Sequence, residues 1–98
     1  MNSRFDELDR RMNAANKNST ARMRSSVVTR RHDDLTLLYN ATTGARIARF
    51  PRKLRDLENL NEYRVSAILE ELEEPVEGDA EERKWWLKYA VGVTSQIS

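Results

Sequence analysis

The chain has 98 residues, of which 39% are hydrophobic and 34% charged, and a formal net charge of +1. This length allows one small domain with a thin apolar core. The absence of cysteine excludes disulfides and thiolate metal sites, and the single histidine, His32, excludes multi-histidine zinc sites and disfavours Ser–His catalysis.

The small net charge conceals two halves of opposite sign. Residues 1–56 carry thirteen Lys or Arg against six Asp or Glu, a net of +7, and residues 57–98 carry four against ten, a net of −6. Such a split favours self-association of opposite ends or a basic binding surface, and we prefer self-association. No apolar run approaches the roughly 20 residues of a membrane span, and no signal-peptide core follows Met1. We therefore expect a soluble intracellular protein, cytoplasmic or nuclear, without membrane contact.

Residues 1–26 are predicted to form an amphipathic, coiled-coil helix. Apolar or small residues recur at spacings of three and four, as in a heptad seam. About three heptads this polar are marginal alone in water, so the helix must pack on a copy of itself or on the rest of the chain. The predicted oligomer seam consists of Phe5, Leu8, Met12 and Ala15.

Four arginines, Arg22, Arg24, Arg30 and Arg31, follow this seam. They offer an alternative interpretation, a basic arm for nucleic acid. Interleaved aromatic residues, which would strengthen that interpretation, are absent.

Residues 27–53 are predicted to be a linker followed by a short hairpin or a pair of extended segments. Leu35, Leu37 and Tyr39 alternate, as in a half-buried strand, and Gly44 marks a turn.

Residues 54–93 are predicted to form a small helical domain, followed by a tail at 94–98. The first helix has an apolar stripe, with Asn61 as an internal N-cap signal and Pro75 as its end. The stripe comprises Leu54, Leu57, Leu60, Tyr63 or Val65, Ile68, Leu69 and Leu72.

In the second helix Asp79 is the predicted cap and Gly92 the predicted end. Its predicted apolar face consists of Trp86, Tyr89, Ala90 and Val93, flanked by Trp85 and Leu87. We expect one tryptophan in the core and the other on a partner-binding face. The candidate partner surface is Trp85 and Trp86 together with Arg22, Arg24, Arg30 and Arg31.

Eight carboxylates crowd the stretch from Glu70 to Glu82. A calcium loop needs oxygen ligands at alternating positions around a tight glycine turn, and this spacing does not match one. We predict a solvated acidic rim that binds no metal, and no catalytic or cofactor-binding residue.

The stretch between Leu60 and Leu87 places apolar, proline and glycine residues in a helix–turn–helix pattern: Leu60, Val65, Ile68, Leu69, Pro75, Val76, Gly78 and Leu87. This pattern is similar to the SAP-type DNA-binding motif, which implies a helix, an extended turn and a second helix. The motif's usual Gly-Leu pair is replaced by Glu73-Glu74, and Ala80 and Trp86 stand where the motif carries Lys and Arg.

A second set of motifs is spread along the whole chain. It comprises the heptad helix, then Asn18-Ser-Thr-Ala-Arg, Leu38-Tyr-Asn-x3-Gly, Ile47-x2-Phe-Pro and Pro75-Val-Glu-Gly. On these residues the chain resembles an uncharacterised fungal family related to meiotically up-regulated proteins. That resemblance implies a coiled-coil arm plus a small helical domain, and no reaction.

The sequence therefore predicts a mainly α fold with an N-terminal coiled-coil helix, a short extended or hairpin segment and a SAP-like helical unit. The predicted function is a non-enzymatic, self-associating structural or protein-interaction module, without a cofactor. Its predicted partners are other copies of the chain and an unidentified protein. The alternative is nucleic-acid binding through the SAP-like unit and the basic N-terminal half.

Overall fold

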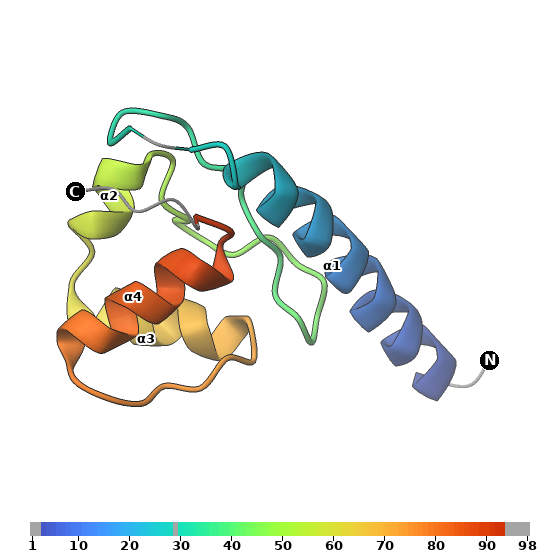
Figure 1. Cartoon of the computed structure of the whole chain (residues 1–98). Helices are drawn as coiled ribbons and strands as arrows, with labels where there is room; N and C mark the ends of the chain where they lie inside the picture. The colour runs from blue at the N-terminus through green and yellow to red at the C-terminus, as the bar shows by residue number, and fades with distance from the viewer. Residues whose placement is uncertain (1–2, 29, 94–98) are drawn as a thin grey trace.

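The structure is a computed structural model that describes residues 3–28 and 30–93, with side chains described from Asp6 onwards. It contains four helices, namely α1 (Ser3–Ser25), α2 (Leu54–Glu58), α3 (Glu62–Glu71) and α4 (Ala80–Ala90) (Figure 1). The described residues hold no strand, so the predicted mainly α fold is confirmed. None of the described helices is long and apolar enough to cross a membrane.

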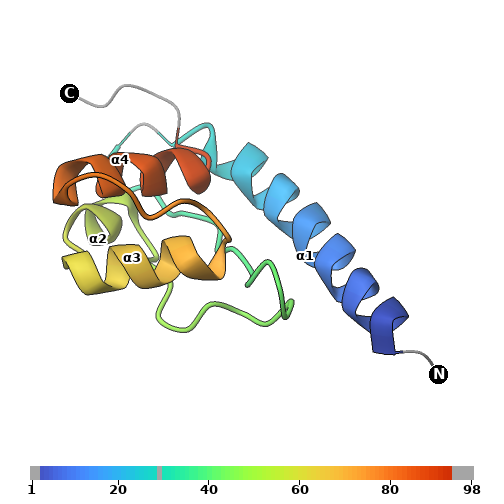
Figure 2. The same cartoon turned by 90° about the horizontal axis from the view of Figure 1, so that it is seen from below.

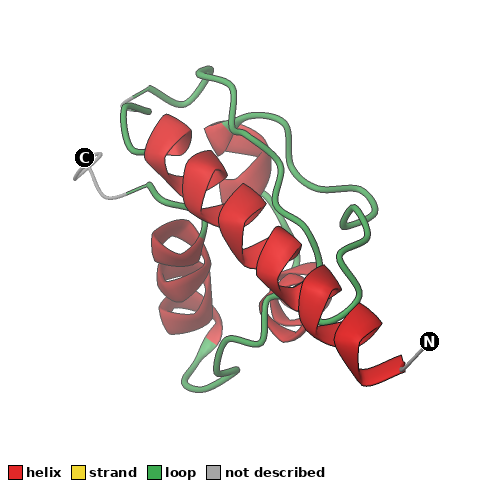
Figure 3. Ribbon diagram, turned by 90° about the vertical axis from the view of Figure 1, so that its right-hand side faces the viewer, coloured by secondary structure: helices red, strands yellow, loops and turns green. Residues whose placement is uncertain are grey.

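Helix α1 is a long arm whose N-terminal end projects beyond the other elements (Figures 1 and 2). The molecule accordingly measures 50 × 26 × 19 Å along its principal axes. We call residues 54–93, which contain the three shorter helices, the body. Figure 3 looks onto the arm as it crosses in front of the body.

The buried face of α1 is small and polar. Ala14, Asn18, Ala21 and Ser25 are buried at spacings of four, three and four, so they lie on one face of the helix. The Asn18 amide donates to the carbonyl of Tyr39 at 2.9 Å and accepts from the Tyr39 amide at 2.7 Å. Asn18 therefore pairs with an extended segment as a neighbouring strand would.

Two further side chains of α1 bind backbone groups. Ser25 Oγ accepts from the Thr36 amide at 3.2 Å, and Arg22 Nε donates to the Ala90 carbonyl at 2.7 Å. Buried backbone groups need partners, and here three side chains of α1 bind four such groups. The arm is thus docked by directed hydrogen bonds as well as by close packing.

The segment between α1 and α2 forms the predicted extended pair, but without a strand ladder. It is closed by two isolated antiparallel bridges, Asp34 with Lys53 and Tyr39 with Arg46. A turn at Asn40 separates the two extended stretches, and Gly44 adopts a φ of 75° within it. Other parts of the molecule replace a partner strand here. Side chains of α1 bind backbone groups of this segment, and the Glu71 carbonyl accepts from the Ala41 amide at 2.8 Å.

The predicted break at Asn61 is confirmed. Its side chain accepts from the Arg64 amide at 2.9 Å and caps α3, which separates α3 from α2. The end of α3 differs from the prediction, because the helix stops before Pro75. Glu73 takes a left-handed φ of 58°, and its amide and that of Glu74 bind the carbonyls of Glu70 and Leu69.

The predicted ends of α4 are both confirmed. Asp79 Oδ1 accepts from the Glu82 amide at 2.9 Å, and Gly92 closes the helix with a φ of 98°. Gly92 has a second role, since a Cβ atom there would collide with the backbone of Arg22 in α1. The same glycine ends α4 and allows the arm to approach it closely.

The core lies between the three body helices and the segment that precedes them. Helices α3 and α4 pack against each other. The largest fully buried apolar side chains of the core are Leu38, Leu54, Leu57, Val65, Ile68, Leu69, Leu87 and Val91.

Candidate functional site

Three aromatic side chains form an exposed cluster on the outward face of α4. Trp85, Trp86 and Tyr89, here called the aromatic cluster, keep 46–58% of their surface exposed. The ring centroids of the two tryptophans lie 5.0 Å apart with planes at 82°, and each tryptophan centroid lies 6.0 Å from that of Tyr89. The rings therefore contact one another on the exposed side of α4.

This arrangement corrects the predicted face of α4. Trp86 and Tyr89 were expected with Ala90 on the apolar face and one tryptophan in the core, but both tryptophans and Tyr89 are exposed. The face that packs inward carries Leu87, Ala90 and Val91, which are smaller than indole rings. Because this stretch is apolar on several faces, its periodicity did not select the buried one.

The basic side chains of α4 are turned to internal acceptors. Arg83 donates to the Gly78 carbonyl at 2.9 Å and to Ser66 Oγ at 3.1 Å. Lys84 donates to the Glu58 carbonyl at 2.6 Å, and Lys88 pairs with the Glu58 carboxylate at 3.2 Å. The outward face is left with aromatic rings and carboxylates.

On α1, the predicted seam residues form an apolar stripe that remains exposed. Leu8 and Met12 are 56% and 64% exposed, Ala15 is also exposed, and the side chain of Phe5 lies outside the described residues. The stripe continues through Ser19 to Met23, which is 72% exposed. With 3.6 residues per turn, it lies roughly a third of a turn from the face that docks on the body. We call Leu8, Met12, Ala15, Ser19 and Met23 the exposed stripe.

The four arginines of the candidate partner surface have different environments. Arg22 is half-buried on the Ala90 carbonyl, and Arg31 pairs with Glu58 at 3.2 Å. Arg24 and Arg30 are exposed, and their side chains make no ion pair or hydrogen bond with the other described residues. Their contacts do not join the arginines to the tryptophans as one site.

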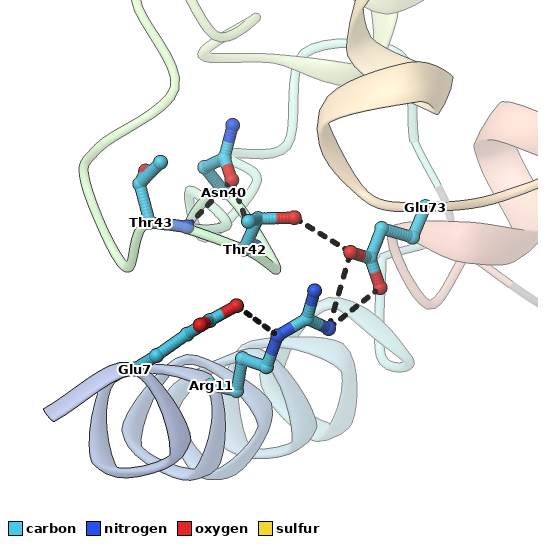
Figure 4. A network of polar contacts seen from close by, with 6 residues as sticks. All are labelled: Glu7, Arg11, Asn40, Thr42, Thr43 and Glu73. Atoms are coloured by element: carbon cyan, nitrogen blue, oxygen red, sulfur yellow. Dashed lines mark hydrogen bonds and ion pairs between the residues drawn. The ribbon is translucent and has the colours of Figure 1, made fainter. Parts of the chain in front are cut away.

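One acidic residue of the rim joins three elements. Glu73 pairs with Arg11 of α1 at 3.2 Å and accepts from Thr42 Oγ1 at 2.6 Å (Figure 4). The hydrogen bond from Thr42, together with the charge of Arg11, lowers the pKa of the Glu73 carboxyl below its ordinary value. With the Arg31–Glu58 pair, this contact joins the basic half of the chain to the acidic half within one molecule. Among the described residues, no group of three or more potential ligand side chains is arranged to hold a metal ion.

A basic groove, which the sequence patterns did not predict, lies between the extended stretches 34–37 and 46–53. Its volume is about 890 Å³, and half-buried Phe50 lines it together with exposed Arg46, Arg49 and Arg52. The one acidic residue of its lining, Asp34, is bound by Lys53 at 2.8 Å, which lowers the pKa of that carboxyl. The sequence signal was an arginine at every third position around Phe50 and Pro51.

No protein-family model, curated protein or solved structure matches the chain. The resemblances to the SAP motif and to the fungal family therefore stay predictions. The candidate surfaces are the aromatic cluster, the exposed stripe and the basic groove.

Proposed function

We propose that the chain is a non-enzymatic protein-interaction module that associates with a second copy through α1 and presents α4 to a protein partner. The observation that carries this proposal is the exposed stripe. One face of α1 is already docked on the rest of the molecule, and a separate apolar stripe still faces outward. Exposed apolar side chains aligned along one face of a helix favour an interaction site, although the polar Ser19 lies among them.

Charge favours an antiparallel pair. Asp9 and Arg24 are both exposed and have no ion-pair partner in the described part of the chain. In an antiparallel pair centred near Ala15, Leu8 meets Met23 of the second copy, and Asp9 comes near its Arg24. In a parallel pair in register, these two charges would stay about 22 Å apart along the helix axis, so they could not pair. The antiparallel pair is isologous, so it closes as a dimer.

Sedimentation equilibrium of the purified full chain tests the association. We expect a reversible dimer at high micromolar concentration, and Leu8→Asp should convert it to a monomer because it places a charge in the apolar contact. Asn13→Asp is the matched control, since it adds the same charge at an exposed position of α1 outside the stripe. A wild-type chain that stays monomeric contradicts the proposal.

The orientation can be tested separately, because the chain has no cysteine of its own. Under oxidising conditions, an equimolar mixture of Leu8→Cys and Met23→Cys chains should form the mixed disulfide. Leu8→Cys alone should cross-link poorly. The reverse pattern contradicts the antiparallel arrangement and leaves self-association intact.

The second candidate function is nucleic-acid binding, and the basic groove favours it. Arginines can neutralise phosphates, and an aromatic ring can stack on a base. The full chain should then bind labelled single-stranded or duplex DNA with an affinity that falls steeply with salt. Arg49→Gln combined with Arg52→Gln should weaken that binding, whereas Arg24→Gln should not. Absence of binding at low salt rejects this candidate.

A further inference from the structure

The geometry points to a guanidinium-binding surface on the outward face of α4, where the aromatic cluster and Glu81 receive an arginine side chain from a segment of a partner protein. The inference rests on the proposed function, in which α4 is the face that is presented. It adds the chemical class of the partner.

The rings of the aromatic cluster are held by one another. Trp85 and Tyr89 are one helical turn apart and nearly parallel, at 12°, while Trp86 stands edge-on to both at 82° and 86°. An aromatic face attracts a cation through its quadrupole, and tryptophan attracts it most strongly. Because the rings already contact one another, their side chains lose less conformational freedom when a ligand binds.

A carboxylate lies next to the rings on the surface of α4. Glu81 precedes Trp85 by four residues, so the two side chains are neighbours on the helix surface. Glu81 is exposed, and its carboxylate makes no hydrogen bond or ion pair with the other described residues. The three cations of α4, Arg83, Lys84 and Lys88, are held by internal acceptors. A cation at the cluster therefore meets an unpaired carboxylate and no competing charge from this helix.

This combination favours arginine over lysine. A guanidinium is planar, stacks on an aromatic ring and offers a fork of donors that matches a carboxylate, whereas an ammonium is a compact and strongly hydrated point charge. The combination disfavours nucleic acid, because stacking platforms for single strands lie in positively charged grooves. The same carboxylates repel an anionic lipid surface.

The chain provides its own reporter for the test. Its only tryptophans are Trp85 and Trp86, so intrinsic tryptophan emission reports on this surface alone. We would titrate the full chain with a short oligo-arginine peptide, and with oligo-lysine and oligo-glutamate peptides of the same length. Oligo-arginine should change the emission saturably and bind at least about three-fold more tightly than oligo-lysine, while oligo-glutamate should have no effect.

Two substitutions locate the site. Trp85→Ala, with Trp86 as the remaining reporter, should raise the Kd for oligo-arginine about five-fold, and Glu81→Gln should raise it about two-fold. The matched controls are Tyr63→Ala and Glu62→Gln on α3, an exposed aromatic and an exposed carboxylate outside the aromatic cluster. Both controls should leave the Kd unchanged.

The outcomes separate this inference from the proposed self-association. The Leu8→Asp monomer should bind oligo-arginine as tightly as the wild type does. Binding by a chain that never dimerises would reject self-association and retain the arginine site. Equal binding of oligo-lysine, loss of binding in the α3 controls, or no emission change with oligo-arginine would overturn the inference. A concentration-dependent emission change of the protein alone would also overturn it, because a second copy would then occupy the surface.

Discussion

The arm and the body are held in place by different kinds of contact. The body closes around apolar side chains such as Leu57, Leu69 and Leu87, all fully buried. The arm docks through Asn18, Ser25 and other small or polar residues of α1, while Leu8, Met12 and Met23 face outward. Apolar burial gives the body its stability, and directed hydrogen bonds fix the place of the arm. We therefore expect the two regions to respond differently to substitution.

The largest effect should come from the body. Leu69→Ala in α3 would leave a cavity at the centre of the core, and such truncations cost about 2–5 kcal/mol. In chemical denaturation this loss should lower the free energy of unfolding of the whole molecule. A comparable loss from Leu8→Ala, measured below the concentration at which the chain associates, would contradict the distinction between core and exposed stripe.

A smaller effect should follow from Asn18→Ala. The substitution leaves the amide and carbonyl of Tyr39 without their partner, which costs about 1–3 kcal/mol. We expect the arm to open before the body unfolds, so amide exchange at Tyr39 should accelerate more than exchange at Ile68. Asn16→Ala, on the exposed side of α1, is the control. Equal acceleration in arm and body would mean that the two unfold as one unit.

Gly92→Ala should also act on the contact between arm and body. The alanine would hold a left-handed φ at a cost of about 1–2 kcal/mol, and its Cβ would meet the Arg22 backbone. The end of α4 and the docking of the arm should therefore weaken together. Gly78→Ala provides a comparison, because its added Cβ would meet the Glu82 side chain rather than the backbone of the arm. If the two variants released the arm equally, the close approach of Arg22 to Gly92 would not be the cause of the weakened docking.

Local signals in the sequence predicted much of the body. The caps at Asn61 and Asp79 and the end at Gly92 act within a few residues, so they can be recognised without tertiary information. The docking face of α1 could not be recognised in this way. Its residues, Asn18 among them, are small or polar, and their partners are backbone groups of a distant segment.

The candidate surfaces were predictable only in part. The exposed stripe follows from heptad spacing, and the predicted partner surface includes both Trp85 and Trp86. The orientation of Trp86 was not predictable, since apolar residues occur on several faces of α4 and only packing of Leu87 against the core selects one. The basic groove depends on two extended stretches meeting, which the spacing of arginines does not reveal.

The smallest effect should come from Glu73, which ties the arm to the turn and to α3. The hydrogen bond from Thr42 and the charge of Arg11 lower the pKa of this carboxyl from its ordinary value of 4.5. Because the folded-state pKa lies below the unfolded one, the stabilisation is present above pH 4.5 and is lost as the pH falls through the folded-state value. The contact is exposed to solvent, which limits its contribution.

Glu73→Gln should therefore loosen the arm slightly at neutral pH, seen as faster amide exchange at Tyr39. The difference from the wild type should shrink in acid, where the wild-type carboxyl is also neutral. Asp34, whose pKa is likewise lowered, titrates in both proteins, so it cancels from the comparison. Glu74→Gln is the control, since its carboxylate makes no ion pair with the other described residues. If the difference persisted unchanged in acid, it would contradict the role of charge and assign the effect to the left-handed backbone at Glu73.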